Sequence, residues 1–77
     1  MDIADAFGQV LRDLRREAGL TQEQLGFEAG LERNFISMLE LGQRQPSLAT
    51  VFKLARALHI PPPRLVELVD GRLEGGQ

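Results

Sequence analysis

The 77-residue chain has no cysteine, tryptophan or tyrosine, and it contains a single histidine, His59. Without cysteine, a disulfide framework and a thiolate metal site are both excluded. One isolated histidine supports neither a metal cluster nor a catalytic triad. No acid pair with a matching partner and no phosphate-cradling glycine loop is present. We therefore expect a protein that is not an enzyme and that has no cofactor, metal site or small-molecule ligand.

Long apolar runs and an excess of positive charge are also missing. No run approaches the ~18 apolar residues of a membrane span, and nothing resembles a signal peptide, so we expect a soluble cytoplasmic protein with no membrane partner. The formal net charge is -2, whereas nucleic-acid-binding domains are usually basic. The total charge argues mildly against nucleic acid, unless cations gather on one face. Four arginines could share such a face: Arg12, Arg16, Arg33 and Arg44.

The length allows one small domain, which buries about 60% of its unfolded surface and would gain stability from an oligomer. Because 43% of the residues are apolar, we expect disorder only at the C-terminal end. The expected domain covers residues 1–70. Residues 71–77, with the sequence GRLEGGQ, are predicted to form a flexible tail.

The stretch from Thr21 to Gly42 predicts two short helices joined by a tight turn. Thr21 and Gln24 have the spacing of a capping box, and Gly30 supplies the left-handed backbone that ends a helix. Periodicity turns some apolar side chains of both helices toward a core: Leu25, Ala29, Ile36 and Leu39. The second helix should begin near residue 32 or 33 and close at Gly42.

The side chains left on the outer face of the second helix suit base recognition. They are Arg33, Asn34, Ser37 and Met38. In the major groove, arginine binds guanine O6 and N7, asparagine binds adenine N6 and N7, and apolar groups touch the thymine methyl. For any one of these residues alone, ordinary solvated surface is the better explanation. The spacing of the whole stretch favours DNA binding.

From Phe7 to about Leu58 the chain resembles the lambda-repressor-like (Xre/Cro) helix-turn-helix family, which includes phage repressors and restriction-modification controller proteins. The matching positions are Arg15, Gly19-Leu20-Thr21-Gln22, Leu25, Gly30, Ile36-Ser37, Glu40, Gly42, Pro46-Ser47-Leu48 and Ala55. The resemblance implies a compact all-α domain of five helices, with the helix-turn-helix at helices 2 and 3. It also implies a transcriptional regulator whose partner is double-stranded DNA.

Three positions depart from the family pattern. Gly26 stands where a small alanine is usual, which permits the same packing but lowers helix propensity by roughly 1 kcal/mol. Glu32 replaces a serine or threonine cap, and Leu41 replaces a residue that is often polar or basic. The last two weaken the expected contacts with the DNA backbone, while the fold is unaffected.

The flanking segments predict three further helices. In the first, the expected inward residues are Ile3, Phe7, Val10/Leu11, Leu14 and Ala18; in the fourth, capped by Ser47, they are Leu48, Val51/Phe52, Leu54/Ala55 and Leu58. His59 is expected to end the fourth helix, where glycine or asparagine is usual. A proline from Pro61 to Pro63 can sit in the first turn of the fifth helix, which is apolar on more than one face.

Several roles follow from chemistry or from the family resemblance. Gln22, Gln43 and Arg44 can hold phosphates, and Phe35 can pack beside a sugar-phosphate strand. The resemblance implies an ion pair between Arg15 and Glu40. It also favours a homodimer through the fifth helix, with Leu65, Val66 and Val69 as candidate interface residues, bound to a pseudo-palindromic operator. The alternative for the fifth helix is simple capping of a small core.

A second hypothesis is a protein-interaction module of the same fold, such as an antitoxin or an adaptor. The negative net charge, the apolar fifth helix, Phe35 and Leu41 motivate it. Salt separates the two hypotheses, because DNA binding weakens steeply as salt rises and an apolar protein interface barely responds.

Overall fold

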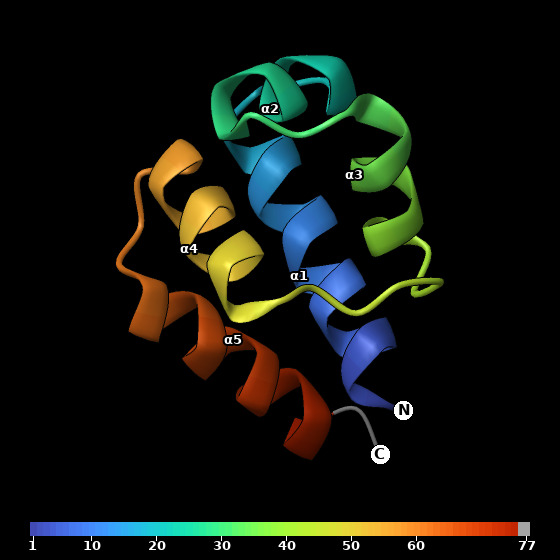
Figure 1. The fold of residues 1–77 in the computed structure, drawn as a ribbon. Coiled ribbons are helices and arrows are strands. Elements are labelled where there is room, and N and C mark those ends of the chain that lie inside the picture. The colour runs from blue at the N-terminus through green and yellow to red at the C-terminus, as the bar shows by residue number, and fades with distance from the viewer. Residues whose placement is uncertain (76–77) are drawn as a thin grey trace.

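The computed structural model describes residues 1–75, which form five α-helices and no strand (Figure 1). The helices are α1 (Ile3–Glu17), α2 (Gln22–Ala29), α3 (Arg33–Glu40), α4 (Leu48–Ala57) and α5 (Pro62–Gly75). The all-α architecture predicted from the sequence, with a helix-turn-helix at α2 and α3, is confirmed. None of these helices is long and apolar enough to cross a lipid bilayer.

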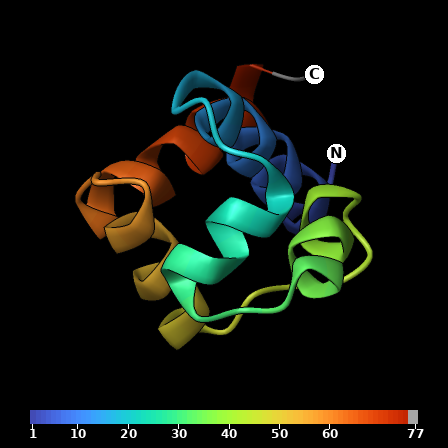
Figure 2. The ribbon, with the colours of Figure 1, turned by 90° about the horizontal axis from the view of Figure 1, so that it is seen from above.

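Helix α1 is the scaffold of the domain, because it packs against α3 on one side and against α5 on the other. Helix α2 lies across the end of α1 and contacts both α3 and α4, and α4 rests on α5. Seen from above, α3 lies on one side of α2 while α4 and α5 lie on the other (Figure 2). Helix α3 therefore sits at the edge of the domain, away from α4.

Short-range signals in the sequence set the helix ends. The capping box is present, with the Gln24 amide 3.0 Å from Thr21 Oγ1 and the Thr21 amide 2.9 Å from Gln24 Oε1. Gly30 ends α2 with a φ of 70°. His59 follows α4 with a φ of 59°, so it takes the left-handed position where glycine is usual.

The core draws at least one large side chain from every helix. The six largest fully buried side chains are Leu11, Leu25, Ile36, Leu39, Leu54 and Leu65. Each helix therefore loses buried apolar surface if any one of its neighbours moves, which makes the five helices one cooperative unit.

Four residues expected to face the core do not. Ala18, which follows α1, is exposed. Ile3 is 58% exposed, Leu48 is 72% exposed and Phe52 is 40% exposed. On α4 the buried stripe runs through Thr50 and Leu54, two positions along from Leu48 and Phe52. Two positions turn a helix by roughly 200°, so Leu48 and Phe52 point away from the core. Ile3 lies in the first turn of α1, where few neighbours cover it.

The expectation of a tail from residue 71 is wrong for residues 71–75, which continue α5. Arg72 donates to Gln9 Oε1 and to Asp13 Oδ2, and Leu73 is half-buried against the core. These contacts with α1 outweigh the low helix propensity of the glycines. Residues 76 and 77 lie outside the described part of the chain.

Candidate nucleic-acid interface

Helix α3 has one face in the core and one face in solvent. Ile36, Leu39 and Glu40 are buried. The four side chains predicted to contact bases are arranged on the opposite face: Arg33 and Asn34 are exposed, and Ser37 and Met38 are half-buried. Because residues four apart lie one above the other on a helix, these four form two adjacent rows. The structure thus places the predicted base-contacting set on one accessible surface.

Gly8 lets α3 lie close against α1. A Cβ atom at this position would collide with the backbone carbonyl oxygens of Leu39 and Glu40. The two helices therefore meet backbone to backbone at the end of α3. Gly8 was not among the residues predicted from the sequence, although a glycine inside a helical pattern is a recognised sign of close packing.

The carboxylate of Glu40 is the polar centre of the junction between α1, α2 and α3. Its side chain is fully buried and forms the ion pair with Arg15 that the resemblance implied. Arg15 Nε lies 2.6 Å from Glu40 Oε2, and Arg15 Nη2 lies 3.0 Å from Glu40 Oε1. Arg15 Nη1 also donates to the Leu20 carbonyl at 2.9 Å. These bonds fix the last residue of α3 to the last turn of α1 and to the α1–α2 turn.

The protonation of this pair follows from its contacts. Burial raises the pKa of Glu40, but hydrogen bonds from Arg15 and Gln22, together with the charges of Arg15 and Arg12, more than compensate, so the pKa lies below its ordinary value. The hydrogen bond to Glu40 raises the pKa of Arg15, although burial opposes it. The pair is therefore fully charged at neutral pH.

Gln22, the first residue of α2, is bound to the same carboxylate. Its Nε2 donates to Glu40 Oε1 at 3.1 Å, and its side chain is half-buried. This bond was not predicted from the sequence. An amide nitrogen carries two hydrogens, so one remains for another acceptor, and the role of Gln22 at a phosphate stays a prediction.

Two residues of the α3–α4 region are joined by a cation–π contact. The Arg44 guanidinium carbon lies 5.8 Å from the centroid of the Phe35 ring. Phe35 is half-buried, whereas Arg44 and Gln43 are exposed. The aromatic ring therefore restrains Arg44 next to the outer face of α3. The predicted phosphate contacts of these three residues remain predictions.

The candidate dimer residues on α5 do not share a surface. Leu65 is fully buried and Val69 is 9% exposed, whereas Val66 is 53% exposed. The expectation that Leu65 and Val69 lie at an interface is wrong, because their four-residue spacing places both against the core of their own protomer. Only Val66 points outward. Leu48 and Phe52, on the neighbouring α4, add exposed apolar surface that the sequence analysis assigned to the core.

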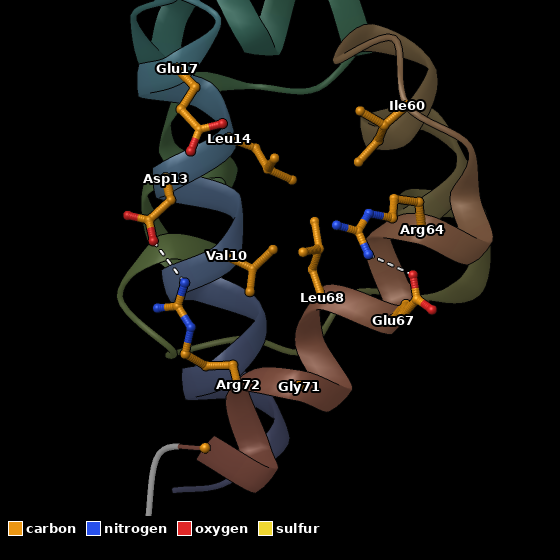
Figure 3. Close-up of a pocket in the computed structure, with 11 residues that line it drawn as sticks. Val10, Asp13, Leu14, Glu17, Ile60, Arg64, Glu67, Leu68, Gly71 and Arg72 are labelled. Carbon is orange, nitrogen blue, oxygen red and sulfur yellow. Dashed lines mark hydrogen bonds and ion pairs between the residues drawn. The ribbon is translucent and has the colours of Figure 1, made fainter.

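A groove runs along the seam between α1 and α5 (Figure 3). Val10, Leu14, Ile60 and Leu68 point toward one another across it. Ion pairs lie at its rim, with Arg72 Nη2 2.8 Å from Asp13 Oδ2 and Arg64 Nη1 2.6 Å from Glu67 Oε1. The first of these pairs ties α5 to α1.

Two further features of the described residues bear on function. Phe27, on α2, is 86% exposed, and the sequence analysis did not mark it. The one sequence signal that could have identified Phe27 is helical spacing, because Phe27 follows Gly26, which faces inward. Within residues 1–75, no group of three or more histidines or acids is placed to hold a metal ion.

The chain belongs to the helix-turn-helix family, because the family model matches residues 11–65. This family consists of DNA-binding transcriptional regulators, not enzymes, as the sequence predicted. The chain is 39% identical to an uncharacterized HTH-type transcriptional regulator, y4dJ, of Sinorhizobium fredii, over 91% of each chain. It is also 39% identical to the control protein C.BamHI of Bacillus amyloliquefaciens, over 79% of this chain and 76% of that protein.

The chain is also similar to a solved structure of a helix-turn-helix controller protein. The restriction-modification controller protein C.AhdI of Aeromonas hydrophila is 48% identical, with a TM-score of 0.78, over 80% of this chain and 94% of that chain. The resemblance to helix-turn-helix regulators and controller proteins inferred from the sequence is confirmed.

Proposed function

We propose that the protein is a sequence-specific regulator of transcription that binds a pseudo-palindromic operator as a homodimer, in the cytoplasm, where bacterial-type regulators meet DNA. The observation that carries this proposal is that α3 has one accessible face and one face fixed to the rest of the domain. Its outer face offers Arg33, Asn34, Ser37 and Met38, while its inner end is fixed to α1 through Glu40. A rigid helix with an accessible polar face is the element that the major groove accepts.

The four outer residues have distinct expected roles. Arg33 and Asn34, at the exposed start of α3, are placed to bind guanine and adenine edges, because the first residues of a recognition helix reach deepest into the groove. Ser37 can bind several base edges, and Met38 offers apolar contact to a thymine methyl.

The second group of residues would hold the DNA backbone. Gln22, Gln43 and Arg44 supply donors for phosphate oxygens, and Phe35 supports Arg44 through its ring. Such contacts fix the position of the protein on the duplex and carry no sequence information directly.

The homodimer would form through the exposed side of α5 around Val66. Leu48 and Phe52 on α4, which packs against α5, are further candidates for the same interface. A twofold dimer places two recognition helices in successive major grooves, so the half-site centres are expected about 10 to 10.5 bp apart.

The first test is selection of bound sequences from randomised duplex DNA, at two salt concentrations. The expected result is an enriched palindrome, with affinity that falls as salt rises. If no sequence is enriched at either salt concentration, the proposal is wrong, and the protein-interaction hypothesis becomes the better one.

The base and phosphate roles separate in a matched pair of variants. Arg33→Ala should weaken binding by roughly 1–3 kcal/mol and relax discrimination at one base pair. Arg44→Ala should weaken binding to all sequences by a similar factor and flatten the salt dependence. Full sequence preference in the Arg33→Ala protein would contradict the assignment.

The dimer surface is tested by placing a charge on it. Val66→Asp should shift the sedimentation coefficient to that of a monomer and weaken operator binding, since a buried unpaired carboxylate disfavours the interface. Ile3→Asp is the control, because Ile3 is 58% exposed and Val66 is 53% exposed. Equal dimerisation of the two variants would exclude this part of α5.

A further inference from the structure

Arg12 lies beside the Glu40 carboxylate but is not needed to neutralise it. Arg12 Nε is 3.6 Å from Glu40 Oε1, a distance too long for a good hydrogen bond. Among the residues that the structure describes, Arg12 makes no other ion pair or hydrogen bond. Its guanidinium therefore keeps its donors available.

The charge of Glu40 is already balanced by Arg15. That arginine binds both carboxylate oxygens, and its side chain is 12% exposed. The three charged groups together carry a net charge of one positive unit. The Arg12 side chain is 37% exposed, so the surplus charge is accessible to solvent.

Gln22 and Arg12 meet at the same oxygen. Gln22 Nε2 lies 3.1 Å from Glu40 Oε1, and this is the atom that Arg12 Nε approaches. The two side chains are therefore near neighbours, although they come from α2 and α1. Both retain unused hydrogens: one on the Gln22 amide and those on the Arg12 terminal nitrogens.

We propose that Arg12 and Gln22 together bind one DNA phosphate, and that Glu40 positions both side chains for it. This inference rests on the proposed function and adds to it a cation outside the helix-turn-helix. A phosphate oxygen between the two side chains would accept a charge-assisted bond from Arg12 and a second bond from Gln22. Because the protein has a net charge of -2, each cation that faces the DNA has a large share in its attraction.

The competing explanation is that Arg12 only supports the fold as a second partner of Glu40. A long ion pair with a partly exposed arginine contributes little to stability. The two explanations differ in what the loss of Arg12 changes: the phosphate role changes the salt dependence of DNA binding, and the structural role changes the melting temperature.

The test compares Arg12→Gln with Lys53→Gln. Both variants lose one positive charge, but Lys53 is exposed on α4, which does not pack against α3. Each protein is titrated with the selected operator at several salt concentrations. For Arg12→Gln, the slope of log K against log salt should fall by about 1 per protomer, with an unchanged melting temperature. For Lys53→Gln, both quantities should match the wild type.

The outcomes distinguish failure of the proposed function from failure of the Arg12–Gln22 phosphate site. If the wild-type protein shows no salt-sensitive DNA binding, the proposed function fails and this inference fails with it. If the wild type binds and the two variants have the same slope, only the inference is overturned. A lower melting temperature of Arg12→Gln with a wild-type slope would likewise assign Arg12 to the fold.

A second measurement identifies the phosphate. Neutral methylphosphonates are introduced one at a time along the operator, and one position should weaken the wild type while leaving Arg12→Gln almost unaffected. Gln22→Ala should lose sensitivity at the same position. Sensitivity of Arg12→Gln at every position where the wild type is sensitive would refute a shared phosphate.

Discussion

Helix α1 has one ion pair at its junction with α3 and one at its junction with α5 that differ in their surroundings. Arg15 binds Glu40 of α3, with side chains 12% and 0% exposed. Asp13 binds Arg72 of α5, with side chains 50% and 34% exposed. The chemical groups are the same, and the distances of 2.6 and 2.8 Å are similar. Burial is therefore the variable that separates them.

This difference in burial means that the α1–α3 junction and the α1–α5 junction are held together with different strength. A buried carboxylate that loses its partner cannot be rescued by water, so the α1–α3 junction holds one arrangement. The exposed pair competes with water and salt, so it adds little to the packing of α5 on α1. Helix α3 is thus fixed to α1 more firmly than α5, the helix that carries the candidate dimer surface.

The strongest test replaces each carboxylate by its amide. Glu40→Gln should lower the free energy of unfolding by about 3–5 kcal/mol, because Arg15 is left buried without a counter-charge. The measurement is chemical denaturation. Unchanged stability of Glu40→Gln would mean that burial does not decide the strength of this pair.

The contribution of the Glu40 carboxylate to stability is also expected to depend on pH, and to be lost in acid. The pKa of Glu40 lies below its ordinary value of 4.5, so the unfolded chain takes up this proton more readily than the folded one. The stability due to Glu40 is complete above pH about 4.5 and is lost as the pH falls through the folded-state pKa. Denaturation of the wild type and Glu40→Gln as a function of pH should therefore converge in acid. Parallel curves would contradict this.

Glycine substitutions should show the same contrast between the α1–α3 and α1–α5 junctions, with smaller changes in the free energy of unfolding. Gly8→Ala should destabilise by about 1–3 kcal/mol, because the new methyl group meets two carbonyls of α3. Gly71→Ala on α5 meets nothing within 4 Å and should stabilise by about 0.5–1 kcal/mol through helix propensity. Thermal melts of both variants provide the check, and opposite signs are the expected result.

The smallest effect belongs to the exposed pair. Asp13→Asn should change the free energy of unfolding by about 0.2–1 kcal/mol, and the change should shrink as salt is added. A loss as large as that of Glu40→Gln would show that the two junctions are equivalent after all.

Local signals made much of the fold predictable. The capping residues Thr21 and Ser47 and the left-handed Gly30 act over three or four positions, so the sequence alone was enough to locate these ends. The outer face of α3 was also predictable, because helical spacing decides which side chains point away from Ile36 and Leu39.

Features that depend on neighbouring helices were not predictable in this way. Leu48 and Phe52 have helical spacing and apolar character, but α4 turns a different stripe toward the core. Residues 71–75 contain two glycines, and only contacts with Gln9 and Asp13 of α1 explain their helical state. The bond from Gln22 to Glu40 joins positions 18 residues apart, and no local pattern encodes it.

The packing of α1 on α5 also affects the order in which the domain can assemble. During synthesis α1 leaves the ribosome first, and α5 follows only after α3 and α4. Until α5 arrives, the side of α1 with Val10 and Leu14 has no cover. A nascent chain therefore carries the residues of the candidate nucleic-acid interface before it has a finished core. A product truncated before α5 lacks part of the apolar core, so we expect proteases to degrade it faster than a chain that includes α5.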